Sequence, residues 1–149
     1  MSTMKVLFVC HANVCRSFMA QELLKHFLPQ VETLSRGLYV DPSLEVPQKV
    51  KDFLLRAGIT PAVHTPAQLS AADMQTADLV LFMEQNQLEE VIDRFSEYTD
   101  KCYLLLDFAF EREQDIADPI LLTGRAFEKQ AQVLRQAVEA CAQYLSASK

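Results

Sequence analysis

Apolar residues in this chain form two kinds of pattern, namely short unbroken runs and runs with helical spacing. The unbroken runs predict buried strands at residues 4–9, 78–83 and 101–106, and residues 31–35 are interpreted as a further strand. Helical spacing is typical of residues 17–28, 46–57, 85–95 and 127–145. Ser70 followed by Asp73 indicates the start of a further short helix. Because strands and helices alternate, we expect an α/β fold with a parallel sheet covered on both faces.

The segment between the last predicted strand and the last helix stands out by its length. Residues 107–123 contain many charges and carry no strong periodicity. Connections of this length are often functional, although the charge also fits a solvated loop without a role.

Composition narrows the class of protein. With 149 residues, of which 50% are hydrophobic, we expect one domain spanning residues 1–149. No apolar run approaches the roughly 20 residues of a membrane span, and the first residues lead directly into a strand. The four cysteines show no metal-ligand spacing, so we expect no metal, no cofactor and a reducing, cytoplasmic location. A net charge of −6 argues against nucleic acid as the main partner.

The strongest chemical signal is the sequence Cys-His-Ala-Asn-Val-Cys-Arg-Ser at residues 10–17. Cys10 ends the first predicted strand, and a helix is expected to begin near Arg16 or Ser17. Backbone N–H groups in such a turn converge on one point, and the positive end of the helix dipole adds to them. This field favours the thiolate of Cys10, and Arg16 can give two parallel hydrogen bonds to a phosphoryl group. The segment therefore predicts a nucleophile within a phosphate cradle.

The alternative is that Cys10 is an ordinary buried cysteine, because free cysteines are often buried and Cys-x5-Arg recurs by chance. The strand-loop-helix context favours the functional interpretation. A phosphoryl transfer from an alcohol or phenol also needs a proton donor for the leaving oxygen. Candidates in or near the long connection are Asp100, Asp107, Asp115 and Asp118. Asp118 stands out because Pro119 stiffens the backbone there, although Asp-Pro is also a common turn.

These features together resemble the low-molecular-weight protein tyrosine phosphatase family, which carries an N-terminal Cys-x-Gly-Asn-x-Cys-Arg-Ser loop and a late Asp-Pro. The similarity covers essentially the whole chain, including residues 35–37, His64 and residues 78–83. It implies a flavodoxin-like three-layer αβα fold with a four-stranded parallel sheet of strand order 2-1-3-4. It also implies hydrolysis of phosphotyrosine and aryl phosphates by a monomer. Its partners would be phosphotyrosine proteins, a tyrosine kinase among them, and a phosphate or oxyanion bound in the loop.

The resemblance also assigns roles to individual residues. Cys10 would form a phosphocysteine, Arg16 would clamp the phosphoryl oxygens, and Asp118 would act as general acid and then as general base. Backbone amides would hold the phosphate along a loop made of His11, Ala12, Asn13, Val14, Cys15, Arg16 and Ser17. The loop would be supported by Asn13, Ser17, Ser35 and His64. Cys15 would pair with an oxidised Cys10 and protect it, while Tyr39 and Ile120 would line the substrate entrance.

The chain departs from the family pattern at several positions. Ala12 replaces the loop glycine, which would cost roughly 1 kcal/mol if the position requires a positive φ. Phe18 replaces a proline, and Glu84 stands where an aspartate is common. Residues 120–122 lack the tyrosines that many eukaryotic members carry after the Asp-Pro, so regulation at those tyrosines is not expected.

Three other functions remain open at this stage. A thioredoxin-coupled arsenate reductase shares the loop but needs two further cysteines close together, and residues 81–90 contain none. Cys102 and Cys141 are isolated and are interpreted as core residues. A phosphoarginine phosphatase resembles the chain too, but prefers threonine where Val14 stands. A phosphate-binding module or phosphocysteine carrier would need neither Arg16 nor Asp118.

Overall fold

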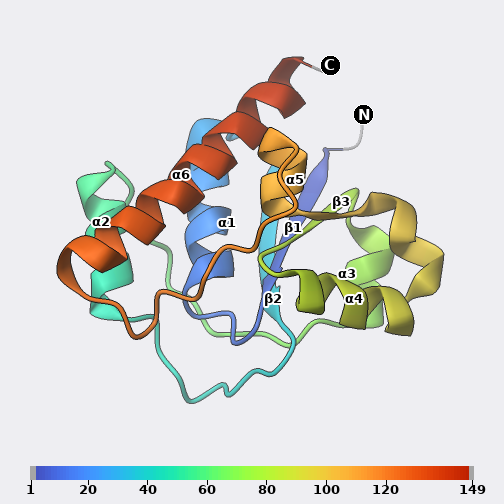
Figure 1. The fold of residues 1–149 in the computed structure, drawn as a ribbon, viewed down its shortest axis with the longest axis horizontal. Helices are drawn as coiled ribbons and strands as arrows, with labels where there is room; N and C mark the ends of the chain where they lie inside the picture. Colours follow the sequence, from blue (N-terminus) through green and yellow to red (C-terminus); the bar gives the residue numbers. More distant parts are fainter. Residues whose placement is uncertain (1–2, 148–149) are drawn as a thin grey trace.

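A parallel four-stranded sheet runs through the centre of the molecule in the computed structural model, which describes residues 3–147 (Figure 1). The strands lie in the order β2-β1-β3-β4 and all neighbouring pairs are parallel. Their bounds are β1 Lys5–Cys10, β2 Glu32–Gly37, β3 Leu79–Phe82 and β4 Cys102–Leu104. The flavodoxin-like three-layer arrangement and the strand order 2-1-3-4 are therefore confirmed.

Helices cover both faces of this sheet (Figure 1). One face carries α1 Arg16–Phe27, α2 Gln48–Arg56, α5 Leu105–Phe110 and α6 Gly124–Ala147. The other carries α3 Ala71–Thr76, α4 Gln85–Arg94 and the 3-10 helix η1 Ser96–Lys101. Strand residues alternate between the two layers, so Val6 and Phe8 pack with α1 and α6, while Leu7 and Val9 pack toward α3 and α4. Burial on both faces explains why β1 and β3 read as unbroken apolar runs.

The last predicted strand is wrong in part. The apolar run at residues 101–106 forms a strand only at Cys102–Leu104, and the chain then turns into α5. Leu105 and Leu106 are buried between the sheet and α6. A short buried helix and a buried strand both give an unbroken apolar run, so the sequence pattern did not distinguish them. Helix α5 also shortens the predicted connection, because residues 107–110 are helical. The short helix after Ser70 is confirmed, with a capping box between Ser70 and Asp73.

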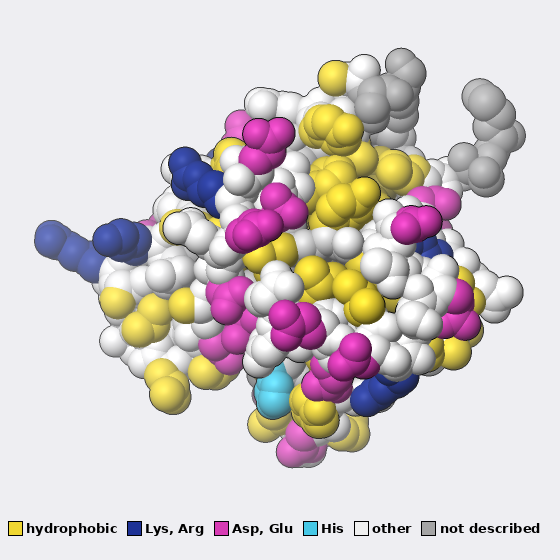
Figure 2. All heavy atoms as spheres, turned by 45° about the vertical axis from the view of Figure 1, so that its right-hand side comes forward, with side chains coloured by type: hydrophobic (Ala, Val, Ile, Leu, Met, Phe, Trp, Pro, Cys, Tyr) yellow, Lys and Arg dark blue, Asp and Glu magenta, His cyan; other side chains and the backbone are white. Residues whose placement is uncertain are grey.

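The carboxyl ends of the strands meet at one edge of the sheet, where ligands bind in folds of this type. Cys10 and Gly37 pair at this edge, at the ends of β1 and β2. Acidic side chains spread over the face of the molecule seen in Figure 2, in agreement with the net charge of −6. None of the helices within residues 3–147 has the length and apolar character needed to cross a membrane.

Candidate active site

The predicted phosphate cradle is a loop between β1 and α1. Cys10 is the last residue of β1, and α1 begins at Arg16. The loop forms the wall of a cavity of about 290 Å³. This cavity is lined by Cys10, His11, Ala12, Asn13, Val14, Cys15, Arg16, Leu44, Glu45, Asp118 and Ile120. The structure thus brings together the cysteine, the arginine and the aspartate that the sequence analysis singled out.

Three carbonyl groups of the loop contact hydrogen-bonding groups of neighbouring segments. The carbonyls of Cys10 and His11 accept from the N–H groups of Leu38 and Tyr39 at 2.9–3.1 Å. The carbonyl of Asn13 lies 2.7 Å from His64 Nε2. In a trans peptide unit the following N–H points opposite to the C=O, and no cis peptide is found among the described residues. The N–H groups that follow these carbonyls, those of residues 11, 12 and 14, are therefore directed to the opposite side of the loop.

Asn13 connects the loop to neighbouring segments through its side chain. It is fully buried and adopts φ 61°, a left-handed conformation that asparagine tolerates. Its side-chain amide donates to Ser17 Oγ at 2.8 Å, and its Oδ1 accepts from the Ala67 N–H at 2.9 Å. Ala12 is not in the left-handed region, so alanine in place of the family glycine adds no backbone strain there.

Ser17 links this support to Cys10. Its Oγ lies 2.9 Å from Cys10 Sγ, and both side chains are buried. Because the Asn13 amide already donates to Ser17 Oγ, the hydroxyl hydrogen is free to point toward the sulfur. A Cys10 thiolate can only accept, so in that form Ser17 donates to the sulfur and stabilises its charge.

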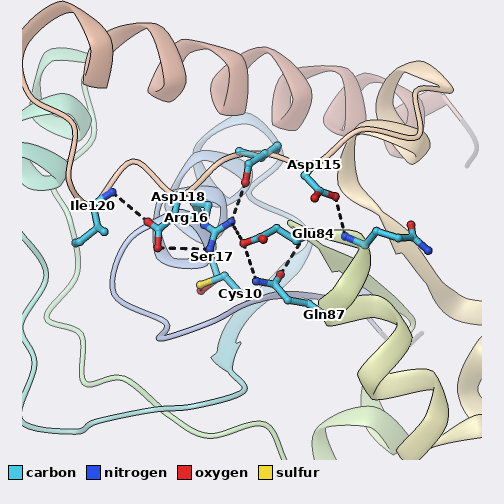
Figure 3. A network of polar contacts seen from close by, with 10 residues as sticks. Cys10, Arg16, Ser17, Glu84, Gln87, Asp115, Asp118 and Ile120 are labelled. Carbon is cyan, nitrogen blue, oxygen red and sulfur yellow. Dashed lines mark hydrogen bonds and ion pairs between the residues drawn. The ribbon is translucent and has the colours of Figure 1, made fainter.

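Arg16 is held rigidly at the start of α1. Its side chain is only 2% exposed. The Nη1 donates to the Ile116 carbonyl at 2.7 Å and to Glu84 Oε2 at 2.5 Å (Figure 3). The Nη2 lies 3.6 Å from Asp118 Oδ2. Two fixed partners on one nitrogen hold the planar guanidinium group in one orientation beside the cavity.

Glu84 was noted in the sequence only as a departure from the family pattern, and its role was missed. It follows β3 and forms the N-cap of α4, where Gln87 donates to Glu84 Oε2 at 3.1 Å (Figure 3). The backbone N–H of Glu84 donates in turn to Gln87 Oε1 at 3.1 Å. These reciprocal bonds with Gln87 hold the Glu84 carboxylate in place, and the carboxylate in turn orients Arg16. The only signal in the sequence was an acidic residue directly after an apolar strand.

Asp118 is the acid candidate at the cavity. Its side chain is 43% exposed. Its Oδ1 accepts from the Ile120 N–H at 3.0 Å, a bond drawn in Figure 3. Asp115 lies nearby in the chain but accepts from the N–H of Gln85 at the start of α4. Asp100 and Asp107 lie in η1 and α5. Of the four candidates, Asp118 is the one that lines the cavity.

The predicted loop supports are placed with one correction. His64 contacts the loop through the Asn13 carbonyl, and its ring stacks on Phe18 with centroids 4.4 Å apart. Burial is the main cause that lowers the pKa of His64 below its ordinary value. Ser35 was expected in the same network, but its hydroxyl donates to Gln21 Oε1 at 2.7 Å. Ser35 therefore ties β2 to α1 and does not bond to Asn13 in this structure.

Gly37 supports the loop in a way that the sequence analysis missed. A Cβ atom at this position would lie 2.9 Å from the His11 carbonyl oxygen and 2.7 Å from Val40 Cγ2. Only glycine lets the end of β2 pass so close behind the loop. The sequence signal was a glycine two residues after the predicted strand at residues 31–35.

Cys15 is buried in the loop. Burial is the main cause that raises the pKa of its thiol to about 12, with the nearby charges of Asp118 and Cys10 acting in the same direction. Cys10 and Cys15 are both free thiols in the structure. The predicted protective disulfide stays a prediction.

Of the two predicted entrance residues, one lines this cavity and the other lines an adjoining pocket that shares His11, Arg16 and Asp118 with it. Ile120 lines the cavity and is 38% exposed. Tyr39 is 56% exposed, donates to Glu90 Oε1 at 2.8 Å and lies 5.2 Å from the His11 ring, centroid to centroid. The opening also includes Leu44 and Glu45, which the sequence analysis did not single out. Within residues 3–147, no group of three or more His, Cys, Asp or Glu side chains could hold a metal ion.

A thiol that ends a strand, a loop that lines a cavity, and a buried arginine at the start of a helix form a site that can hold a phosphate group beside a cysteine. The family model of low molecular weight phosphotyrosine protein phosphatases matches residues 5–149. The chain therefore belongs to this family and is a phosphoric monoester hydrolase.

Known proteins similar to this chain carry two kinds of name. It is 37% identical over 116 residues to a protein-arginine-phosphatase of Geobacillus stearothermophilus, covering 77% of this chain and 78% of that protein. It is 33% identical to the probable low molecular weight protein-tyrosine-phosphatase EpsP of Ralstonia nicotianae, with 91% of each chain covered. The solved structure of the YwlE arginine phosphatase from Geobacillus stearothermophilus superposes with a TM-score of 0.90 at 32% identity, covering 97% of this chain and 94% of that one.

Proposed function

We propose that this protein hydrolyses phosphotyrosine in proteins through a phosphocysteine on Cys10. The observation that carries the proposal is the convergence of Cys10, Arg16 and Asp118 on one cavity. The nucleophile and the clamp come from a single loop, and the acid lies beside the clamp, with its Oδ2 3.6 Å from Arg16 Nη2.

In the first step, the Cys10 thiolate attacks phosphorus, the S–P bond forms and the bond from phosphorus to the phenol oxygen breaks. Asp118 gives its proton to the leaving oxygen. Charge on the equatorial oxygens is met by the loop amides and by Arg16, which are held in place before the reaction begins. Ser17 donates to the sulfur and so stabilises the attacking thiolate.

In the second step, Asp118 is a carboxylate and takes a proton from water. The resulting hydroxide attacks phosphorus, the S–P bond breaks, and the Cys10 thiolate is restored with release of inorganic phosphate. The same carboxyl group thus serves as acid and then as base, so one well-placed side chain is sufficient for both steps. No other co-reactant than water is needed.

Phosphoarginine is the second candidate substrate, because similar proteins are named arginine phosphatases. The residue that bears on this choice is Val14, which is buried and lines the cavity. An aliphatic side chain offers a phenyl ring an apolar contact and gives a guanidinium group no hydrogen-bond acceptor. Val14 therefore favours phosphotyrosine.

The test is hydrolysis of matched phosphotyrosine, phosphoserine and phosphoarginine peptides at mildly acidic pH with a metal chelator present. We expect the highest kcat/KM on phosphotyrosine and no turnover by Cys10→Ser. Val14→Thr should shift the preference toward phosphoarginine, while Val63→Thr, a fully exposed valine, serves as the matched control. A wild-type preference for phosphoarginine would overturn the substrate assignment, and turnover by Cys10→Ser would overturn the nucleophile.

We propose that the partners are cytoplasmic phosphotyrosine proteins, including a tyrosine kinase, and that the protein acts as a monomer. The proposal is supported by the family membership and by the thiols at Cys10 and Cys15, which a reducing compartment preserves.

A further inference from the structure

Asp118 is carried by a segment without regular structure. Residues 111–123 form neither helix nor strand, yet a general acid must stay within hydrogen-bond reach of the leaving oxygen. The upstream side of Asp118 is fixed by Ile116, which is 2% exposed. Its N–H donates to the Met83 carbonyl at 2.8 Å, and its own carbonyl accepts from Arg16 at 2.7 Å. A second anchor is needed on the downstream side.

That anchor is Lys49, the second residue of α2. Its Nζ donates to the carbonyls of Pro119 at 3.2 Å and Leu122 at 2.7 Å, and also to the carbonyl of Ile120. The ammonium group also lies 5.3 Å from the centroid of the Phe127 ring. Three carbonyl groups use all three protons of the ammonium. Within the described chain, every hydrogen bond that reaches residues 119–122 from outside residues 118–123 comes from Lys49.

The three carbonyls that accept from the Lys49 ammonium group belong to residues 119, 120 and 122, which follow Asp118 in the chain. The Ile120 N–H, which belongs to the same turn, donates to Asp118 Oδ1 at 3.0 Å. Fixing the carbonyls of residues 119 and 120 therefore fixes the peptide group that orients the carboxylate. Burial is the main cause that raises the pKa of Cys15, while the charges of Arg16 and Lys49 lower it. The Lys49 ammonium group is therefore close enough to act electrostatically on the phosphate loop.

We propose that Lys49 is a positioning residue for catalysis, which holds the turn at residues 119–122 so that the Asp118 carboxyl group faces the leaving oxygen. This inference rests on the proposed role of Asp118 as general acid. Lys49 touches neither the phosphoryl group nor the nucleophile in this account, and acts through the backbone that carries Asp118.

If Lys49 had a purely structural role, it would only connect α2 to the segment before α6. This role predicts other kinetics than the positioning of Asp118. Loss of such a tie would lower activity equally for all substrates. Loss of a positioned acid affects mainly substrates with poor leaving groups, because good leaving groups depart without protonation. The two roles also differ when Asp118 is already absent, since a residue that acts through Asp118 then has nothing to position.

The experiment is a double-mutant cycle of Lys49→Met and Asp118→Ala, measured as kcat/KM over a series of aryl phosphates that differ in leaving-group pKa. The matched control is Lys51→Met, which removes the same charge from the same helix. The inhibition constant of inorganic phosphate and the melting temperature are measured for each variant. Lys49→Arg, which keeps a multiple donor, serves as the rescue.

We expect Lys49→Met to lower kcat/KM on the poorest leaving group by roughly tenfold, a fraction of the 10²–10⁴ that a general acid contributes. The best leaving group and the phosphate inhibition constant should be nearly unchanged. In the Asp118→Ala background, Lys49→Met should cost nothing further. Lys49→Arg should recover most of the activity, and Lys51→Met should match the wild type.

Equal losses from Lys49→Met in both backgrounds, or a loss independent of the leaving group, would overturn the proposal while the acid role of Asp118 stands. If Asp118→Ala itself shows no leaving-group dependence, Asp118 is not the acid, and the positioning role falls with it. Where Lys49→Met does not fold, Lys49→Gln provides the same cycle, because its shorter amide cannot reach three carbonyls.

Discussion

Arg16 Nη1 lies 2.5 Å from Glu84 Oε2, although the two residues are 68 positions apart in the sequence. The contact joins the first residue of α1 to the N-cap of α4, on the opposite face of the sheet. A buried guanidinium group needs a partner, and this partner leaves the Nη2 side of the group directed toward Asp118. Glu84 therefore stabilises the charge of Arg16 and also fixes its orientation.

Glu84→Ala should lower kcat/KM on phosphotyrosine by roughly tenfold or more, because small misplacements of a catalytic group are costly. Glu84→Gln should fall between this variant and the wild type, since its amide oxygen still accepts from Arg16. Glu89→Ala, on the exposed side of the same helix, is the control. Wild-type kinetics in Glu84→Ala would show that Arg16 is oriented without this carboxylate.

Gly37→Ala should damage the loop. The added Cβ would meet the His11 carbonyl oxygen at 2.9 Å, so the loop backbone must shift. We expect kcat/KM to fall by about tenfold or more, on the same positional argument. Gly58→Ala is the matched control, because that glycine has φ +83° but nothing within 4 Å of an added Cβ. It should lose stability and keep its kcat/KM, and an equal kinetic loss in both variants would contradict the account.

His64 should make stability depend on pH in a defined direction. Burial lowers its pKa in the folded protein below the ordinary value of 6.5, so the unfolded chain takes up a proton more readily. The contribution of His64 to stability is therefore complete above pH 6.5 and is lost as the pH falls through the folded pKa. The free energy of unfolding of wild type minus His64→Gln, measured by denaturant titration, should shrink from pH 8 to pH 5.5. A difference that grows as the pH falls would contradict this sign.

Of the four cysteines, Cys10 should be the one that an alkylating reagent modifies. Burial raises the pKa of Cys15 to about 12, of Cys102 to about 11 and of Cys141 to about 12, so these thiols stay protonated near neutral pH. We expect iodoacetamide at pH 7.5 to modify Cys10 first and inorganic phosphate to protect it. Cys10→Ser should remain unmodified over the same period. Peptide mass spectrometry that finds Cys15 modified as fast as Cys10 would contradict the burial argument.

The sequence predicted the sheet and the cradle because both depend on local patterns. Buried strands read as apolar runs, and Cys10, Arg16 and Ser17 lie within one loop, so their spacing fixes their proximity. The run at residues 101–106 misled us, because Leu105 and Leu106 are buried in either structure.

The residues that position the cradle were not predictable in the same way. Glu84 and Lys49 reach the site from α4 and α2, and their roles depend on how distant elements pack. Ser35 is the opposite case, because a role in the loop support was expected for it. Its hydroxyl donates to Gln21 instead. A single sequence carries no signal for which surface charge will face a backbone carbonyl after folding.

The most direct test of the account is to trap the phosphocysteine. Asp118→Ala, which lacks the base for the second step, is mixed with an aryl phosphate that has a good leaving group and is quenched in acid. We predict that mass spectrometry finds one phosphoryl group on the peptide that contains Cys10. Release of the phenol without a phosphoryl group on the protein, or with the group on another residue, would contradict the mechanism.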